Sequence, residues 1–272
     1  MRPVLRILKR IWFLNFLRRI AYASNYYNKK YIQILKWGFS SREDTNFTYN
    51  LTDRNISELA HTVAAVTKKD YKTILAYFYE AMNNQELKDH ILNETMKSPL
   101  GRYADKEIRF GRRLGWYTFV RIMKPKVVIE TGIDKGLGSV LLCSALLKNK
   151  EEGFEGRYYG TDINPEAGYL LQGKYKEVGE VLYGDSIESL KKFKHKIDLF
   201  INDSDHSADY EYQEYVTIEP LMTEKTVILG DNAHCTDKLA AYSAATGRNY
   251  FFFKEEPKDH WYPGAGIGIS FK

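Results

Sequence analysis

The chain has 272 residues, 44% of them hydrophobic, which suits one large globular domain with an appendage. Its two cysteines, Cys143 and Cys235, lie in neither a CxxC nor a Cys/His spacing, which excludes a disulfide framework and a cysteine-rich zinc site. The net charge of +5 is local, because residues 1–42 contain ten Lys and Arg and no Asp or Glu, and the remainder carries −5. Nucleic acid is not an expected partner, because the basic residues lie in this segment and no RNA- or DNA-binding motif is present.

Residues 1–45 are predicted to form a basic, amphipathic N-terminal segment. One helical face is apolar and the other is basic, with Val4, Leu5, Ile7, Leu8, Ile11, Trp12 and Leu14 on the first and Arg2, Arg6, Lys9, Arg10 and Arg19 on the second. No apolar run reaches the roughly 18 residues that a membrane-spanning helix needs, and no signal peptide is evident. We therefore expect a cytoplasmic protein in which residues 1–20 either pack in a homo-oligomer or make peripheral contact with a membrane.

The chain changes character at Pro125. Residues 46–124 contain four stretches of helical periodicity, at 53–67, 70–83, 85–96 and 104–123. In residues 125–272, short apolar runs alternate with helical stretches, and seven strands are predicted at 126–131, 157–162, 180–185, 197–203, 226–231, 249–255 and 266–271. Helices fit between consecutive strands except the last two, whose short connection favours an antiparallel hairpin. We expect a doubly wound α/β sheet with its last strand antiparallel.

A glycine-rich turn follows the first predicted strand, in the sequence ETGIDKGLGS. Glycine lets a ligand approach the backbone closely, and a helix N-terminus favours a polar or anionic group. The dinucleotide fingerprint would require glycine at position 134, where the chain has Asp134, so a nicotinamide or flavin site fits poorly. Acids at three successive strand ends, Glu130, Asp162 and Asp185, suit a nucleoside at the rim of the sheet, although Asp185 and Ser186 also suit a helix N-cap.

In these features the sequence resembles the class I S-adenosylmethionine-dependent methyltransferases, from Lys126 onward. The shared features are the seven-strand order with its terminal hairpin, the E-x-G-x-x-x-G turn, Asp162 and the Gly184-Asp185-Ser186 step. The resemblance implies a Rossmann-like fold, S-adenosylmethionine as cofactor, and a helical segment at 46–124 that acts as a lid or an oligomer contact. The cofactor-binding residues it implies are Glu130, Thr131, Gly132, Asp134, Gly136, Ser139, Asp162, Asp185, Ser186 and Asp203.

Polar residues also gather at the ends of the fourth and fifth predicted strands. INDSDH supplies Asp203, Asp205 and His206, and GDNAH supplies Asp231, Asn232 and His234. Oxygen ligands from two adjacent strand ends suit Mg²⁺. The pattern resembles that of metal-dependent macrolide-sugar and catechol-type O-methyltransferases, which implies Asp203, Asp231 and Asn232 as metal ligands, with His206 and Asp203 as catalytic residues. The alternative is that these residues cap helices and form solvated turns.

The sequence therefore predicts a Mg²⁺-assisted O-methyltransferase that acts on a hydroxyl of a small molecule or glycan, in natural-product or glycan biosynthesis. A metal would lower the pKa of the hydroxyl, and His206 would accept its proton. The candidate substrate contacts are Asp205, His234, Arg112, Arg113, Trp116, Tyr117, His260, Trp261 and Tyr262. Two alternatives stay open: a metal-free methyltransferase acting on nitrogen or oxygen, and a non-catalytic cofactor-binding protein at a membrane.

Overall fold

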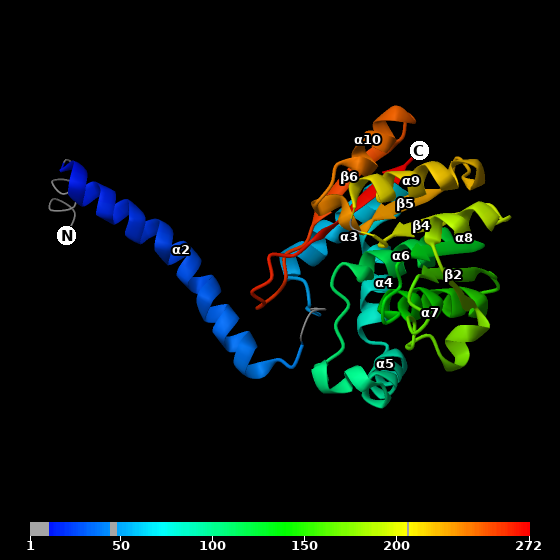
Figure 1. Cartoon of the computed structure of the whole chain (residues 1–272), viewed down its shortest axis with the longest axis horizontal. Coiled ribbons are helices and arrows are strands. Elements are labelled where there is room, and N and C mark those ends of the chain that lie inside the picture. The colour runs from blue at the N-terminus through cyan, green and yellow to red at the C-terminus, as the bar shows by residue number, and fades with distance from the viewer. Residues whose placement is uncertain (1–10, 44–47, 206) are drawn as a thin grey trace.

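The computed structural model describes residues 11–43, 48–205 and 207–272, which form a seven-stranded sheet, helices on both of its faces, and one projecting helix, α2 (Trp12–Ser40) (Figure 1). The strands are β1 (Val127–Thr131), β2 (Arg157–Asp162), β3 (Gly179–Tyr183), β4 (Leu199–Asn202), β5 (Val227–Gly230), β6 (Asn249–Lys254) and β7 (Gly266–Phe271). Their order is β3-β2-β1-β4-β5-β7-β6. β1 to β5 pair in parallel, and β7 is antiparallel to both neighbours, which confirms the predicted sheet.

Two layers of helices bury the sheet. One layer contains α3 (Asp53–Thr67), α4 (Tyr71–Met82), α5 (Gln85–Lys97), α6 (Arg113–Met123) and α7 (Leu137–Glu151), and the other contains α8 (Ser186–Lys192), α9 (Ala208–Ile218) and α10 (Lys238–Ala245). Successive residues of β1 serve the two layers, since Val128 packs with the first and Ile129 with the second. Every residue of β1, β4 and β5 is buried, which explains their unbroken apolar runs.

Side-chain caps fix the starts of three helices that precede the sheet. Thr52, Asp70 and Asn84 each accept a hydrogen bond from a backbone N–H in the first turn of α3, α4 and α5. These helices coincide with the predicted stretches 53–67, 70–83 and 85–96 to within one residue at each end. The chain around α3 is also tied to the far end of the sequence, because the Asn55 side chain donates to the Lys254 carbonyl and accepts from the Glu256 N–H.

One predicted helical stretch, 104–123, is wrong in its first part, and one predicted connecting helix is absent. After the 3₁₀ helix η1 (Pro99–Tyr103), residues 104–112 are irregular, and α6 begins only at Arg113. Gly111, with φ of 50°, adopts the left-handed conformation just before that helix. Between β2 and β3 the chain forms turns and the 3₁₀ helix η2 (Gly173–Glu177) instead of an α-helix. The remaining 3₁₀ helices are η3 (Glu219–Leu221) and η4 (Asp231–His234).

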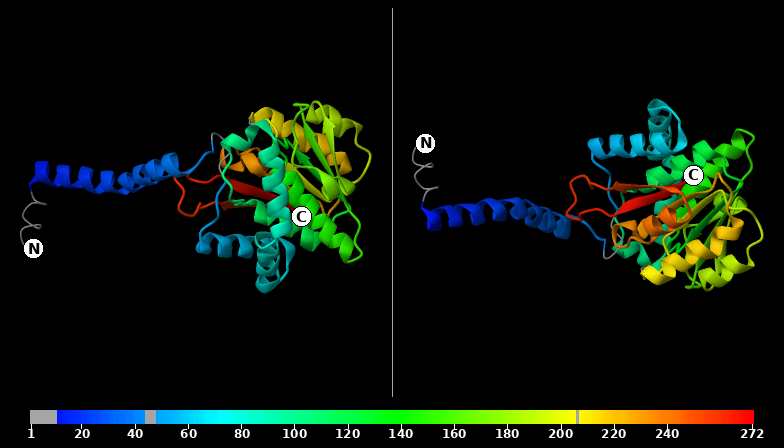
Figure 2. Two further views of the ribbon diagram at one scale, coloured as in Figure 1. Left: turned by 90° about the horizontal axis from the view of Figure 1, so that it is seen from below. Right: turned by 90° about the horizontal axis from the view of Figure 1, so that it is seen from above.

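Helix α2 is 29 residues long and contains no buried residue. Figure 2 shows it standing clear of the sheet and its helices in both views. Near its end, the Trp37 ring centroid lies 6.2 Å from that of His260 and 5.5 Å from that of Trp261. Residues 1–10 of the predicted amphipathic segment lie outside the described part of the chain. Within the described ranges, no helix combines the length and the apolar character needed to cross a membrane.

Candidate cofactor and acceptor site

One cavity of about 880 Å³ opens at the carboxyl ends of β1 to β5. Ligands of open α/β sheets bind at this edge. The strand ends and the turns after them form one wall, and residues 103–113, Tyr49 and Tyr262 belong to the lining as well. Residues 104–112 form no helix, and several of them line the cavity. Their apolar and polar side chains therefore follow the cavity wall, and the helical periodicity of the sequence was misleading there.

The turn after β1 packs directly against the end of β4. Gly132 has φ of 76°, and a Cβ there would clash with the Asp203 backbone. A Cβ at Gly138 would clash with the Glu130 carboxylate and lie 2.9 Å from the Trp116 ring. Glycine is thus required at both positions, because no side chain fits between the turn and its neighbours.

Glu130 is buried at the floor of the cavity, with 2% of its surface exposed. Its carboxylate accepts hydrogen bonds from the Tyr158 hydroxyl and, at 3.2 Å, from the Ser139 hydroxyl. Burial raises the pKa of Glu130 to about 7, although both hydrogen bonds and the charge of Arg113 act in the opposite direction. Glu130 therefore exchanges its proton near neutral pH and can become a binding partner for a cation.

Asp162, at the end of β2, is oriented by two backbone N–H groups. Asp134 donates to its Oδ2 at 2.9 Å, and Asn164 donates to its Oδ1 at 2.8 Å. Each carboxylate oxygen keeps a lone pair for a second donor, and Asp162 lines the cavity. This arrangement suits the two hydroxyls of a ribose.

Asp185 and Ser186 follow β3 at the next position along the rim, and both line the cavity. Asp185 caps α8 by accepting from the Glu188 N–H at 2.8 Å, and it also accepts from the Tyr210 hydroxyl at 3.0 Å. Ser186 donates to the buried Glu214. Asp185 is therefore the N-cap of α8, as considered from the sequence, and it also lines the cavity.

Glu214 of α9 joins two strand ends and the start of a helix beneath the cavity. It accepts hydrogen bonds from Thr131 at 3.0 Å, from Asn202 and from Ser186. Burial raises the pKa of Glu214 to about 7, although these donors lower it. The carboxylate thus holds the ends of β1 and β4 and the start of α8 together.

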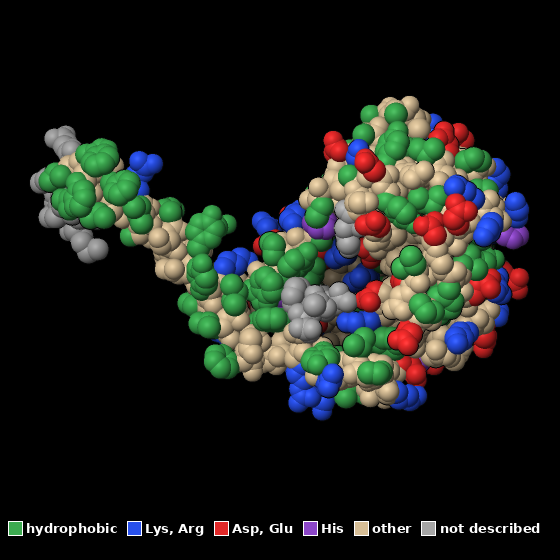
Figure 3. All heavy atoms as spheres, viewed as in Figure 1, with side chains coloured by type: hydrophobic (Ala, Val, Ile, Leu, Met, Phe, Trp, Pro, Cys, Tyr) green, Lys and Arg blue, Asp and Glu red, His purple; other side chains and the backbone are tan. Residues whose placement is uncertain are grey.

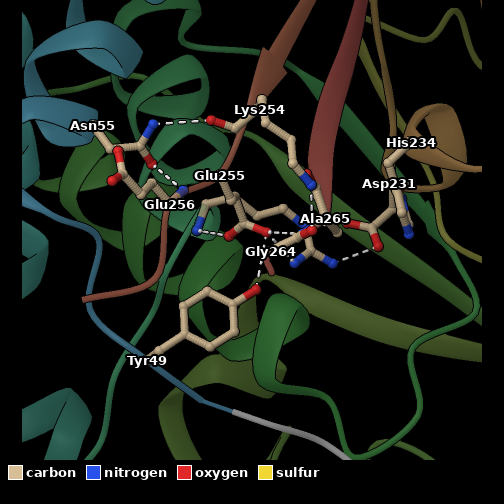
Figure 4. Close-up of polar contacts among 10 residues, drawn as sticks. Tyr49, Asn55, Asp231, His234, Lys254, Glu255, Glu256, Gly264 and Ala265 are labelled. Atoms are coloured by element: carbon tan, nitrogen blue, oxygen red, sulfur yellow. Dashed lines mark hydrogen bonds and ion pairs between the residues drawn. The ribbon is translucent and has the colours of Figure 1, made fainter. Parts of the chain in front are cut away.

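The side of the cavity away from the cofactor rim, called the acceptor side here, contains Arg112, which forms two ion pairs. Figure 4 shows them as dashed lines to Asp231 and Glu255. Its Nε donates to Asp231 Oδ1 at 2.6 Å, its Nη2 donates to Asp231 Oδ2, and its Nη1 lies 3.0 Å from Glu255 Oε2. Glu255 also accepts from the Tyr49 hydroxyl at 2.9 Å and from the N–H groups of Arg112 and Ala265. Every charge in this cluster has a partner, as burial requires.

Asp203 and Asp231 lie close enough to share a hydrogen bond, which requires a proton on one of them. Burial and the charge of Asp231 raise the pKa of Asp203 well above its usual range. Burial also acts to raise the pKa of Asp231, but the charge and hydrogen bonds of Arg112 outweigh it and lower that pKa. Of the two, Asp203 therefore holds a proton more readily, and the charge of Arg112 favours the ionised form of Asp231.

These residues do not fit the Mg²⁺ site that the resemblance implies. Arg112 occupies both oxygens of Asp231, and the raised pKa of Asp203 disfavours the ionised form that a metal ligand needs. Asn232 is fully buried and is not among the residues that line the cavity. Within those residues no cluster of three His, Cys, Asp or Glu side chains could hold a metal ion, and His206 lies outside them. The Arg112 guanidinium therefore binds the carboxylate that Mg²⁺ was expected to bind.

The other predicted site residues fall into two groups. The cavity is lined by Arg112, Arg113, Gly132, Asp134, Asp162, Asp185, Ser186, Asp203, Asp205, His234 and Tyr262. The rest lie behind its wall: Thr131 and Ser139 bond to Glu214 and Glu130, Gly136 packs on Gly168, and Trp116 and Tyr117 are buried in the core. His260 and Trp261 pack around Trp37 at the foot of α2.

Several residues of the site were missed from the sequence. Tyr49, Arg109, Tyr158, Glu214 and Glu255 hold or line the cavity. Tyr158 lies in a predicted strand and Glu214 in a predicted helix. Hydrophobic periodicity identifies such elements but does not show which of their polar side chains belong to a site. A faint signal existed in the adjacent Arg112 and Arg113, since two neighbouring guanidiniums near acidic strand ends suggest ion pairs.

Comparisons with known proteins agree with this geometry. Residues 129–233 match the family described as "Methyltransferase domain". A solved structure of a "putative O-methyltransferase" from Klebsiella pneumoniae is similar at 13% identity and a TM-score of 0.50, over 68% of this chain and 89% of that chain. A methyltransferase from Geobacter sulfurreducens is similar at 14% identity and a TM-score of 0.49, over 68% of this chain and 89% of that chain. The SAH-bound methyltransferase PaMTH1 from Podospora anserina is similar at 13% identity and a TM-score of 0.45, over 83% of this chain and 98% of that chain. No curated protein matches the chain.

Residues 129–233 are thus a methyltransferase domain, and the strand order is that of the class I methyltransferase fold. The protein is an enzyme that uses S-adenosylmethionine as its methyl donor.

Proposed function

We propose that this enzyme transfers the methyl group to a hydroxyl oxygen of a small polar acceptor, such as a sugar, a vicinal diol or a glycan. The observation that carries the proposal is that one cavity holds both the cofactor-binding rim and the charged cluster of Arg112, Arg113, Asp203 and Asp231. Its volume, about 880 Å³, is near the upper end for ligand pockets and leaves room for an acceptor beside the cofactor. The description of the Klebsiella protein as an O-methyltransferase supports the same acceptor atom.

The cofactor supplies the electrophilic methyl group when it is bound. Glu130 would face its ammonium group, Asp162 its ribose hydroxyls, and Asp185 with Ser186 its adenine. These residues fit because each lines the cavity and keeps unused hydrogen-bonding capacity. Glu130 would bind in its ionised form, since only the carboxylate attracts a cation.

Arg113 is the residue we propose for the methionyl carboxylate. Its guanidinium lines the cavity 5.3 Å from the Trp116 ring, and its charge acts on Glu130 and Asp203. Its Nε is buried without a hydrogen-bond partner among the described residues, in contrast to Arg112. A buried donor of this kind is costly unless a ligand satisfies it, and a carboxylate is the preferred partner of a guanidinium.

The acceptor hydroxyl needs a group that takes its proton. Because the raised pKa of Asp203 favours its protonated form, this carboxyl would donate a hydrogen bond and would not accept that proton. His234 lines the cavity, and its Nδ1 lies 3.0 Å from the Asp231 backbone carbonyl. A carbonyl oxygen only accepts, so Nδ1 carries the hydrogen and Nε2 of the neutral ring is left as an acceptor. We therefore propose His234 as the general base. His206, the base implied by the resemblance, stays a prediction.

The chain's own groups would supply orientation in place of a metal. Arg112 fixes Asp231, and the ionised Asp231 in turn holds the proton of Asp203 toward itself. An acceptor with two neighbouring hydroxyls could bond to this cluster and present one oxygen to the methyl group, which lowers the entropic cost of reaction. The Mg²⁺-assisted alternative requires Arg112 to release Asp231.

The test is transfer of a deuterated methyl group from S-adenosylmethionine to a panel of sugars, catechols and amines, followed by mass spectrometry. We expect an O-methylated product, formed equally well in EDTA and in Mg²⁺. A product methylated only on nitrogen would contradict the proposed acceptor atom. Activity that EDTA abolishes and Mg²⁺ restores would contradict the role given to Arg112.

A further inference from the structure

Helix α2 exposes an unusual amount of apolar surface. Its large apolar side chains are open to solvent, among them Trp12 at 77%, Phe13 at 59%, Leu35 at 61% and Phe39 at 91%. Figure 3 shows these side chains along the whole projecting helix. Soluble monomers seldom expose so long an apolar surface unless it binds a partner or a membrane. The helix therefore has a function as a contact surface.

The apolar side chains of α2 are concentrated on one face. At about 100° per residue, Phe13, Phe16, Leu17, Ile20, Tyr27, Tyr31, Ile34 and Leu35 share that face. The opposite face carries Asn15, Arg18, Tyr22, Asn25, Lys29, Gln33 and Lys36. A helix of 29 residues with this pattern offers an apolar stripe roughly 43 Å long. This is the pattern of a helix that lies in an interface plane.

The charge of α2 decides between a membrane and a second copy of the chain. Residues Trp12–Ser40 contain five Lys and Arg and no Asp or Glu. Two such helices side by side would repel each other, because neither offers a carboxylate to the other's lysines. An anionic lipid surface attracts the same charges, at about 1 kcal/mol for each basic residue near it.

The aromatic residues of α2 are of the type that membrane interfaces favour. Tyr27 and Tyr31, on the apolar face, are both more than half exposed, and Trp12 is near the start of the helix. Tyr and Trp place an apolar ring in the acyl region and a polar group among the headgroups. We propose that α2 binds peripherally to the surface of a bilayer that contains anionic lipids, and carries the methyltransferase domain on it.

The test uses the full-length chain and sedimentation with vesicles of equal parts phosphatidylcholine and phosphatidylglycerol. We expect the protein to pellet with these vesicles and to stay in the supernatant with phosphatidylcholine alone. Failure to pellet with the anionic vesicles would overturn the proposal. Equal binding to both compositions would overturn the electrostatic part of it.

Two variants locate the binding surface. Changing Arg18, Arg19, Lys29, Lys30 and Lys36 to Gln should weaken vesicle binding by about a thousandfold or more, because each residue contributes about 1 kcal/mol. The matched control changes five exposed lysines of the catalytic part to Gln, namely Lys69, Lys72, Lys176, Lys192 and Lys225, and should bind as the wild type does. Equal loss in both variants would mean that net charge, and not α2, is responsible.

The second variant removes the apolar stripe through Phe13→Ser, Leu17→Ser and Ile20→Ser. It should lose vesicle binding while it keeps the methyl-donor affinity of the wild type, because these residues lie far from the cavity. Analytical ultracentrifugation without lipid should give the same mass for this variant and the wild type. A wild-type dimer that the three substitutions dissociate would instead establish the second copy as the partner and overturn the membrane proposal.

Discussion

The cofactor side and the acceptor side of the cavity are held together in different ways. On the cofactor side, Asp162 bonds to residues 2 and 28 positions away, and Asp185 bonds to residues 3 and 25 positions away. On the acceptor side, Arg112 bonds to Asp231 and Glu255, which are 119 and 143 positions away, and Tyr49 bonds to Glu255 across 206 positions. The first side depends on turns and on strands that are neighbours in the chain, whereas the second depends on long-range tertiary packing and buried charge.

The largest expected effect comes from removing the central ion pair of the acceptor side. Arg112→Ala leaves Asp231 and Glu255 buried without their cation, so we expect the free energy of unfolding to fall by about 3–5 kcal/mol. Urea unfolding measures this change. Arg113→Ala is the matched control, because it removes a neighbouring guanidinium that attracts Glu130 and Asp203 through its charge but forms no ion pair with either of these described residues, and it loses a ring contact worth about 1 kcal/mol or less. Equal destabilisation by both would remove the distinction between the two arginines.

The second prediction concerns proton transfer on the acceptor side. His234→Asn keeps a donor for the Asp231 carbonyl but removes the accepting nitrogen, so we expect kcat to fall by at least about a hundredfold. Calorimetry should find the affinity for S-adenosylhomocysteine unchanged. His206→Asn is the companion variant. If it alone loses activity, the base implied by the family resemblance is the correct one.

The third prediction concerns the boundary between the two sides, at Arg113. The wild type should bind S-adenosylmethionine about 10 to 100 times more tightly than decarboxylated S-adenosylmethionine, because the latter lacks the proposed partner of the guanidinium. In Arg113→Met this ratio should approach one. Arg102→Met, which changes an exposed arginine stacked on Tyr103, should keep it. A ratio that Arg113→Met leaves intact would place the carboxylate elsewhere.

The smallest effect is expected on the cofactor side, from the titration of Glu130. Because the pKa of Glu130 is about 7 in the free protein and the ionised form binds the cation, a proton must leave before binding at lower pH. The affinity for S-adenosylhomocysteine should therefore rise with pH up to about 7, by at most tenfold per pH unit, and then level off. In Glu130→Gln the affinity should be lower and this slope absent. An unchanged slope would assign it to another group.

The same contrast explains what the sequence could predict. The strand order, Glu130, Asp162 and the Asp185-Ser186 step follow from apolar runs and turn residues that adjoin them in the chain. Arg112 was named only as a substrate contact, since nothing within ten residues of it points to Asp231 or Glu255. The expected metal site failed for this reason, because the two strand ends do meet, but a cation from a distant loop is already there. Helical periodicity likewise failed at residues 104–112, where the chain lines the cavity.

The loop between β6 and β7 touches the foot of α2 on one side and the acceptor cluster on the other. Trp37 packs on His260 and Trp261, His260 packs on Tyr49, and Tyr49 bonds to the same Glu255 that holds Arg112. Four consecutive side chains thus connect the arm to the guanidinium. Turnover measured in free solution and turnover measured on lipid are, for this reason, two separate kinetic quantities to determine.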